Sequence, residues 1–294
     1  MSGQKKSVPL ALVSVGIWAT LSTSAKLLLK DLPDLQVLGV SGALAFAFML
    51  IMLFATGAYK KLKNYKPRQY LQMAGLGFLG LFLYSALYYY AIGVLTAGEA
   101  CILNYLWPIM LVLFSCLLLK EKMTVRKAAA LILSFAGVAA LSFGGAAGGG
   151  RWAGVAACVA AAACYGLYCV LNKKTDFDQT VLMTVVWFTV TVCACILGPL
   201  TETWVKTDLR QSLGLVWIGV FVNAVAYLTW GMSLKYAKST ALIANLAYLV
   251  PVLSLVLSAL VLKEPVTWQA ALALILIVGG ILLQSMKTGE KNRE

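Results

Sequence analysis

Ten long apolar runs limit what this chain can fold into. Residues 180–200, for example, pass without one charged side chain. A helix rises about 1.5 Å per residue, so about 20 such residues cross a hydrocarbon core of about 30 Å. Of the 294 residues, 61% are hydrophobic and 12% are charged, too few charges for the surface of a soluble domain. The sequence predicts an all-α membrane protein that crosses the bilayer many times.

The runs predict ten transmembrane helices. The first run follows Lys5 and Lys6 without a cleavage signature of small residues, so we expect it to be retained as a span. The expected spans are residues 8–29, 35–57, 70–94, 96–119, 125–143, 152–171, 180–200, 212–234, 239–262 and 267–285.

An internal duplication relates the two halves of the chain. The fourth run contains Asn104-Tyr105-Leu106-Trp107-Pro108 and ends at Lys120-Glu121, and a similar pattern recurs 143 residues later. Leucine bias cannot supply the shared proline, the Lys-Glu stop or the shared glycine. The identical pairs include Tyr105 and Tyr248, Leu106 and Leu249, Pro108 and Pro251, Ser115 and Ser258, Leu119 and Leu262, Glu121 and Glu264, Thr124 and Thr267, Gly137 and Gly280, and Ser142 and Ser285.

A glycine-rich segment at residues 144–150 separates the halves and resembles a flexible linker. We expect a first repeat at residues 1–143 and a second at 151–294, each with five spans. Because five is odd, the second repeat is predicted to be inverted relative to the first.

Lysine and arginine predict the orientation. Eighteen of the 24 fall on the side that holds both termini and six on the other, so both termini are expected in the cytoplasm of a bacterial inner membrane. The net charge of +13 comes from short clusters between runs, so orientation signals explain it better than a nucleic-acid partner.

Metal and cofactor chemistry find little support in the sequence. The chain has no histidine, and its seven cysteines lie inside apolar runs without ligand spacing. We expect no cofactor, no metal and no catalytic residues. The expected partners are the lipid bilayer and a small-molecule substrate, and the sequence leaves the oligomeric state open.

Glu99 is the only acidic residue inside a predicted span. A carboxylate in a membrane is by default a candidate for binding an ammonium group or exchanging a proton. Thr96-Ala97-Gly98-Glu99 also fits a capping box, in which Glu99 would serve the start of its helix. Both interpretations stay open and are compatible.

Prolines predict two broken helices near the middle of the membrane. Pro108 lacks an N–H and frees the carbonyl of Asn104, while Pro251 frees that of Ala247. Paired broken helices near the midplane are typical of transport sites, although prolines that only kink helices for packing are the alternative.

Aromatic and amide residues gather at helical spacing on several spans, where an amphipathic ligand could use rings for stacking and amides for polar groups. The candidate substrate-binding residues, with Glu99 among them, are Trp18, Tyr84, Tyr88, Glu99, Asn104, Trp107, Tyr165, Tyr168, Asn223, Tyr227, Trp230, Asn245 and Tyr248, and the helix-break residues are Pro108 and Pro251.

Two five-span copies with these prolines and Lys-Glu stops resemble the drug/metabolite transporter superfamily, in its ten-helix EamA branch. Glu99 and Asn104 in Glu-x-x-x-x-Asn-Tyr-Leu-Trp-Pro, Trp18, and Tyr168-Cys169 with Asn172-Lys173 are similar to aromatic amino acid and methyl viologen exporters of that branch. The resemblance covers about residues 8–286 and implies a central cavity, alternating access and export of small metabolites.

We therefore expect a secondary transporter that exports amino acids, aromatic and other apolar ones first. The nearest alternative is an uptake or efflux carrier for other metabolites or organic cations. A membrane-embedded enzyme would need a clustered nucleophile, base or metal set, which this sequence does not offer. Proton coupling and the substrate stay open.

Overall fold

The computed structural model describes residues 4–143, 150–237, 243 and 245–285, and in these residues it is helical without strands. Eight described segments are long and apolar enough to cross a membrane, and two shorter apolar helices follow at Leu249–Leu262 and Trp268–Leu283. The predicted all-α membrane fold is confirmed. The glycine-rich linker at 144–149 and the start of the ninth run at 239–242 lie outside the described residues.

The first five spans use eight α-helices and one π-helical segment, and a short 3-10 helix, η1 (Ala58–Asn64), follows the second span. They are α1 (Gln4–Ala19) with α2 (Leu21–Leu28), α3 (Asp34–Ala55), α4 (Pro67–Gly77) with the π-helical η2 (Phe78–Leu83) and α5 (Tyr84–Val94), α6 (Ala97–Asn104) with α7 (Trp107–Leu118), and α8 (Val125–Phe143).

The second five spans follow the same plan, with π-helical turns in the eighth and ninth. They are α9 (Arg151–Lys173), α10 (Gln179–Thr201), α11 (Leu209–Val216) with η3 (Trp217–Val225) and α12 (Ala226–Tyr236), α14 (Leu249–Leu257) with η4 (Ser258–Leu262), and α15 (Trp268–Ser285).

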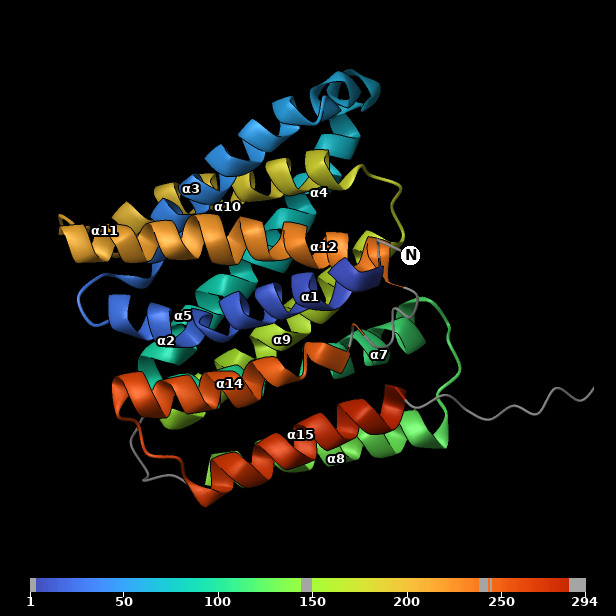
Figure 1. The fold of residues 1–294 in the computed structure, drawn as a ribbon, viewed down its shortest axis with the longest axis vertical. Coiled ribbons are helices and arrows are strands. Elements are labelled where there is room, and N and C mark those ends of the chain that lie inside the picture. Colours follow the sequence, from blue (N-terminus) through green and yellow to red (C-terminus); the bar gives the residue numbers. More distant parts are fainter. Residues whose placement is uncertain (1–3, 144–149, 238–242, 244, 286–294) are drawn as a thin grey trace, which may run out of the picture.

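The packing of the helices follows the duplication. The first span packs on the eighth through α1 and α12, and the third packs on the sixth through α5 and α9. Since the first span is equivalent to the sixth and the third to the eighth, these two contacts are equivalent to each other. Three further pairs join equivalent spans directly: α3 with α10, α6 with α14, and α8 with α15. Figure 1 shows α3 and α10 at one edge of the bundle and α8 and α15 at the other.

A pair of equivalent glycines explains the close contact between α8 and α15. A Cβ atom on Gly280 would lie 2.8 Å from the carbonyl oxygen of Ala130 and would overlap the Ser134 hydroxyl. A Cβ on Gly137 would lie 3.1 Å from the carbonyl oxygen of Ala273, the position equivalent to Ala130. Two helices can approach this closely in lipid only where small residues face each other, so the shared glycine is a packing requirement.

The Lys-Glu stops are left-handed helix ends. Lys120 and Lys263 have φ angles of 56° and 58°, and they are the described non-glycine residues with positive φ. In each case the next N–H, from Glu121 or Glu264, bonds back at 3.4 Å to the carbonyl of the serine six residues earlier. This arrangement satisfies carbonyls that a helix end would otherwise leave unpaired, and it ends the fourth and ninth spans sharply.

Asp178 caps the start of α10. Its Oδ1 accepts hydrogen bonds from the N–H groups of Thr180 and Val181, at 3.0 and 3.2 Å, and its Oδ2 accepts one from Lys61 at 2.6 Å. Burial alone would raise the pKa of the Asp178 carboxyl, but the lysine and the two N–H groups outweigh it and hold the pKa below its usual value.

Candidate functional site

The fourth span breaks where the sequence places its proline. Helix α6 ends at Asn104, a turn covers Tyr105 and Leu106, and α7 begins at Trp107, one residue before Pro108. The ninth span shows the equivalent turn before α14, which starts two residues ahead of Pro251. Both breaks therefore occur at matching positions of the two halves, close to the centre of the bundle.

One of the two freed carbonyls has a partner from the other half. The hydroxyl of Tyr105 donates a hydrogen bond of 2.9 Å to the carbonyl oxygen of Ala247, which loses its i+4 donor at Pro251 and also accepts a 3.1 Å bond from the N–H of Val250. Tyr105 lies at the break of the fourth span, so the two broken helices are joined directly.

A cavity of about 290 Å³ lies against these breaks. Its volume is at the lower end of the range for small-molecule sites, about 300 to 1,000 Å³. Its lining is Trp18, Leu21, Tyr84, Tyr88, Cys101, Asn104, Tyr105, Trp107, Pro108, Tyr165, Tyr227, Trp230, Ala247, Tyr248 and Val250.

The lining combines equivalent rings from both halves. Tyr84 and Tyr227 are separated by the same 143 positions as Tyr105 and Tyr248. Tyr84 directly follows the π-helical η2, and Tyr227 follows the π-helical η3 by two residues, as is frequent at functional sites. Each half therefore contributes equivalent rings to the cavity.

The rings pack closely in two groups. The ring of Trp18 lies 5.1 Å from that of Tyr227 and 5.4 Å from that of Trp230. The ring of Tyr165 lies 5.1 Å from that of Tyr84 and 5.3 Å from that of Trp107. These separations are typical of stabilising aromatic pairs, so the rings are held in place before any ligand binds.

Polar groups in the cavity are few and uncharged. The amide Nδ2 of Asn104 donates a 3.0 Å hydrogen bond to the hydroxyl of Tyr84. None of the described residues that line the cavity is Lys, Arg, Asp or Glu. A ligand here would meet aromatic faces, hydroxyl groups and one amide.

The structure brings ten of the predicted residues to the cavity and leaves five away from it. Tyr168 stacks on Tyr165 and packs over Gly80, and Asn245 is exposed near the start of the ninth span. Asn223 is buried within η3 but does not line the cavity, and neither do Pro251 and Glu99.

Five lining residues were not among the predicted site residues. Of these, Tyr105 was identifiable, because the duplication pairs it with Tyr248, which was predicted. Cys101 shares a helical face with Asn104 and Pro108, which also marks it in the sequence. The remaining three, Leu21, Ala247 and Val250, carry no chemical signal of their own.

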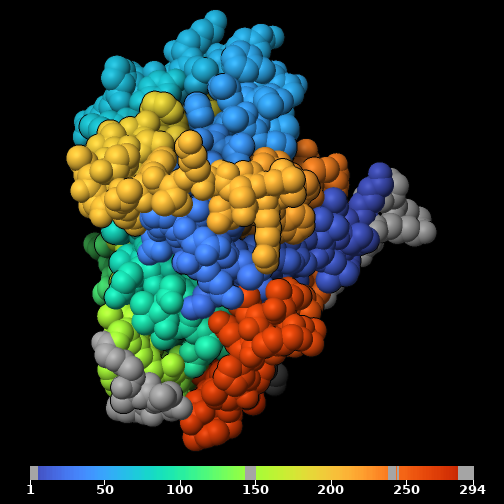
Figure 2. All heavy atoms as spheres, turned by 90° about the vertical axis from the view of Figure 1, so that its left-hand side faces the viewer, coloured from blue at the N-terminus to red at the C-terminus, as the bar shows by residue number. Residues whose placement is uncertain are grey.

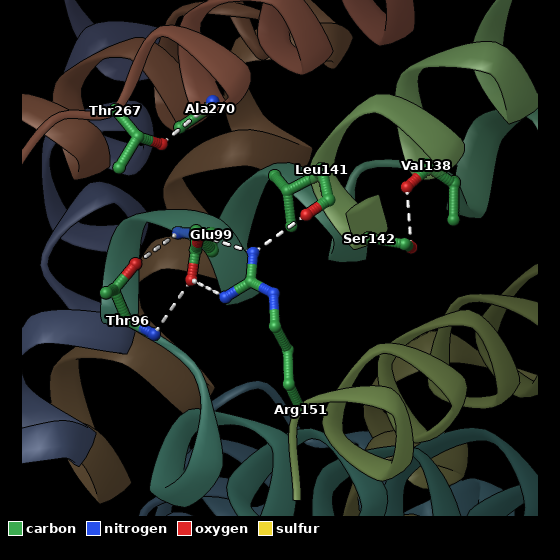
Figure 3. Close-up of polar contacts among 8 residues, drawn as sticks. All are labelled: Thr96, Glu99, Val138, Leu141, Ser142, Arg151, Thr267 and Ala270. Carbon is green, nitrogen blue, oxygen red and sulfur yellow. Dashed lines mark hydrogen bonds and ion pairs between the residues drawn. The ribbon is translucent and has the colours of Figure 1, made fainter. Parts of the chain in front are cut away.

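Glu99 forms a buried ion pair that the sequence analysis did not anticipate. Its Oε1 lies 2.9 Å from Nη2 of Arg151, the first residue of α9, and its Oε2 lies 3.3 Å from Nη1. The predicted capping box is also present, since the N–H of Thr96 donates to Glu99 and the N–H of Glu99 donates to the Thr96 hydroxyl. Figure 3 shows that Arg151 also reaches the carbonyl of Leu141 at the end of α8.

Further contacts close the bundle at this end, which we call the Arg151 end. The ammonium group of Lys26 donates to the carbonyls of Ile92, Gly93 and Leu95, where α5 finishes. The Glu264 carboxylate accepts a 2.8 Å hydrogen bond from the N–H of Ala97, the first residue of α6.

Figure 2 looks at the Arg151 end, where the atoms of α2, α5 and η4 meet without an opening between them. The cavity starts deeper along α6, at Cys101.

Comparison with known proteins places the chain in a family. An uncharacterized transporter, YvbV of Bacillus subtilis, is 31% identical over 214 residues, which cover 71% of this chain and 70% of the relative. The aromatic amino acid exporter YddG of Ancylobacter novellus is 28% identical over 217 residues, covering 72% and 74%.

A crystal structure of a protein with 22% identity has a TM-score of 0.68 and covers 96% of both chains, which supports the fold alone. The sequence profile of the EamA-like transporter family matches residues 5–143 and 152–286. The chain belongs to the EamA-like transporter family, within the drug/metabolite transporter superfamily.

Proposed function

We propose that the chain is a secondary transporter that exports amino acids, aromatic and other apolar ones first, by alternating access. The carrying observation is the ring-lined cavity at the two helix breaks, enclosed by spans from both halves. Rings that pack at 5.1 to 5.4 Å offer stacking surfaces to an aromatic side chain, and the volume suits a molecule of amino-acid size.

The family and one relative support this proposal. EamA-like proteins are transporters, and the relative from Ancylobacter novellus is named an aromatic amino acid exporter. A carrier for other small metabolites or for organic cations is the second candidate, favoured by the uncharged aromatic lining, which would also accept a cation. We propose no enzymatic activity.

The proposal includes the two-repeat organisation and its orientation. The halves would be residues 1–143 and 151–294, with both termini in the cytoplasm and the Arg151 end outside. A fluorescent reporter fused after Gly148 should then stay dark, because the connection that carries it is exported. Fluorescence of that fusion, with a C-terminal fusion dark, would overturn the orientation.

Counterflow in proteoliposomes tests the function directly. Vesicles loaded with one unlabelled amino acid should accumulate the same labelled amino acid from outside, and a panel of radiolabelled amino acids ranks the substrates. We expect aromatic and large apolar amino acids to give the strongest signal, whereas acidic ones should give none. Equal and background-level counterflow for the whole panel would refute amino-acid transport.

A further inference from the structure

Asn104 presents hydrogen-bond acceptors that have no donor. Its side chain is buried, with 8% of the residue exposed, and its Oδ1 has no hydrogen-bond partner. Pro108 removes the N–H that would serve the backbone carbonyl of the same residue, and no side-chain hydroxyl among the described residues takes its place. A buried polar atom without a partner requires an explanation, and here the residue that carries it lines the cavity.

The equivalent position in the other half has no such acceptors. Ala247 occupies it, has no polar side chain, and its carbonyl is already bonded by Tyr105. The free acceptors are therefore confined to one side of the cavity, which gives a bound molecule a defined orientation.

The surroundings of Asn104 favour a positive charge. Asn104 is the last residue of α6, where the carbonyl end of a helix carries a partial negative charge. The rings of Tyr84, Trp107 and Tyr165 lie around the cavity, and aromatic faces attract cations. An ammonium group has three donors and no acceptor, and so it matches a pair of acceptors.

The same cavity offers little to a carboxylate. No lysine or arginine belongs to its described lining. The N–H groups of Ile109 and Met110 at the start of α7 both bond to the carbonyl of Leu106 at 3.0 Å, so they are not free to bind an anion. A carboxylate in this cavity would be desolvated without a cationic partner, which is costly.

We propose that Asn104 is the ammonium acceptor of this transporter and that the cavity recognises the ammonium group of its substrates but not the carboxylate. The preferred class is then a primary amine with an aromatic or apolar body and a missing or masked carboxylate, such as an arylalkylamine or an amino-acid ester. This inference rests on the proposed transport function and shifts its preferred substrates from free amino acids to amines without a free carboxylate.

A matched series of phenyl compounds tests the proposal on the purified full chain. The series is phenethylamine, phenylalanine methyl ester, phenylalanine and 3-phenylpropionate, and binding is followed by tryptophan fluorescence, since Trp18, Trp107 and Trp230 line the cavity. We expect the amine and the ester to bind at least about tenfold more tightly than phenylalanine, and 3-phenylpropionate not to bind. Binding of 3-phenylpropionate as tight as that of phenethylamine would overturn the proposal.

Two variants assign the effect to Asn104. Asn104→Leu has a similar shape without acceptors in its side chain, and it should weaken phenethylamine binding by about tenfold. Asn104→Asp keeps acceptors, loses the amide donor to Tyr84, and should retain phenethylamine binding. The matched control ligand is the N,N,N-trimethyl derivative of phenethylamine, which is cationic but cannot donate a hydrogen bond, and its affinity should be equal in wild type and Asn104→Leu.

The outcomes separate this inference from the function on which it rests. Equal losses for the trimethyl and the primary ammonium ligand in Asn104→Leu, or equal losses in both variants, would refute the acceptor role. If phenylalanine gives counterflow and binds more tightly than phenethylamine and the ester, the inference is refuted while amino-acid export stands. Absence of binding and of counterflow for every ligand would refute the proposed function itself. Monodisperse elution and an unchanged Tm establish that each variant is folded.

Discussion

The buried pair of Glu99 and Arg151 is expected to stabilise the closed Arg151 end more than it contributes to substrate binding. The decisive change is Glu99→Gln, which keeps the shape and the capping of Thr96 but removes the charge. Arg151→Gln and the double variant complete a cycle that isolates the interaction between the two side chains.

The burial of the two side chains sets the expected loss of stability. The Glu99 side chain is 6% exposed and that of Arg151 is 16% exposed, so removing one charge leaves the other with little water. Breaking such a buried pair costs about 3 to 5 kcal/mol. In Glu99→Gln, Arg151 keeps its 2.7 Å hydrogen bond to the Leu141 carbonyl, so we expect a stability loss at the lower end of this range, about 3 kcal/mol. At about 2 to 4 °C per kcal/mol, Tm should fall by about 6 to 12 °C.

A thiol-reactive dye measures these shifts in detergent, because unfolding exposes the buried Cys101 and Cys158. Glu99→Gln and Arg151→Gln should each lower the stability by about the same amount. The double variant should lose less than the sum of both by about 2 kcal/mol, since the second change removes the charge that the first left unpaired.

Additive losses, to within about 0.5 kcal/mol, would refute the reasoning, because independent sites behave in that way. Transport by Glu99→Gln between about pH 5.5 and 8.5, measured beside wild type, then separates the two interpretations of Glu99. A folded variant with a normal rate and pH profile would leave only the structural role. A folded variant without transport would support a functional carboxylate.

Three further predictions follow from the structure. Trp107→Ala and Tyr84→Ala should each weaken substrate affinity by about 1 kcal/mol, roughly fivefold, with normal expression, because each removes a stacking face; wild-type affinity in counterflow for both would make these rings packing residues. Gly280→Ala should lower stability by about 1 to 3 kcal/mol in thermal unfolding, whereas Gly279→Ala, whose Cβ would meet only one side-chain atom at 3.7 Å, should not; equal Tm values would refute the contact. The depressed folded-state pKa of Asp178 means that its lysine pair stabilises above about pH 4 and that this stability is lost as the pH falls through the folded-state pKa. Asp178→Asn should therefore lower Tm at neutral pH and match wild type in acid, and a difference in Tm that does not change with pH would contradict this.

The spans and their breaks were predictable because their causes are local. Length and apolarity decide whether a segment such as residues 180–200 crosses the bilayer, and this segment forms α10 with ends within a residue. A missing N–H decides where a helix can break, so Pro108 marked the end of α6 within the sequence itself.

The composition of the site was only partly predictable because it depends on helix rotation and neighbours. Tyr165 and Tyr168 share a helical face, yet only Tyr165 reaches the cavity, because the absence of a side chain at Gly80 draws Tyr168 into a contact between helices. In the sequence, Arg151 is one of the six basic residues on the side away from the termini, where an orientation signal explains it. Its contact with Glu99 joins positions 52 residues apart, and no spacing rule in a single sequence indicates that pairing.

Under the proposed alternating access, the bond from Tyr105 to Ala247 would couple substrate release to the reversal of the transporter. Inverted repeats reach their opposite-facing state by exchanging the roles of the two halves. In that state the counterpart bond would run from Tyr248 to the carbonyl of Asn104, the equivalent of Ala247. Tyr248 would then take the carbonyl that we propose for the ammonium group, and Tyr105 would release Ala247. A hydroxyl of the protein would thus displace the substrate, and the affinities on the two sides of the membrane would become unequal without any added charge.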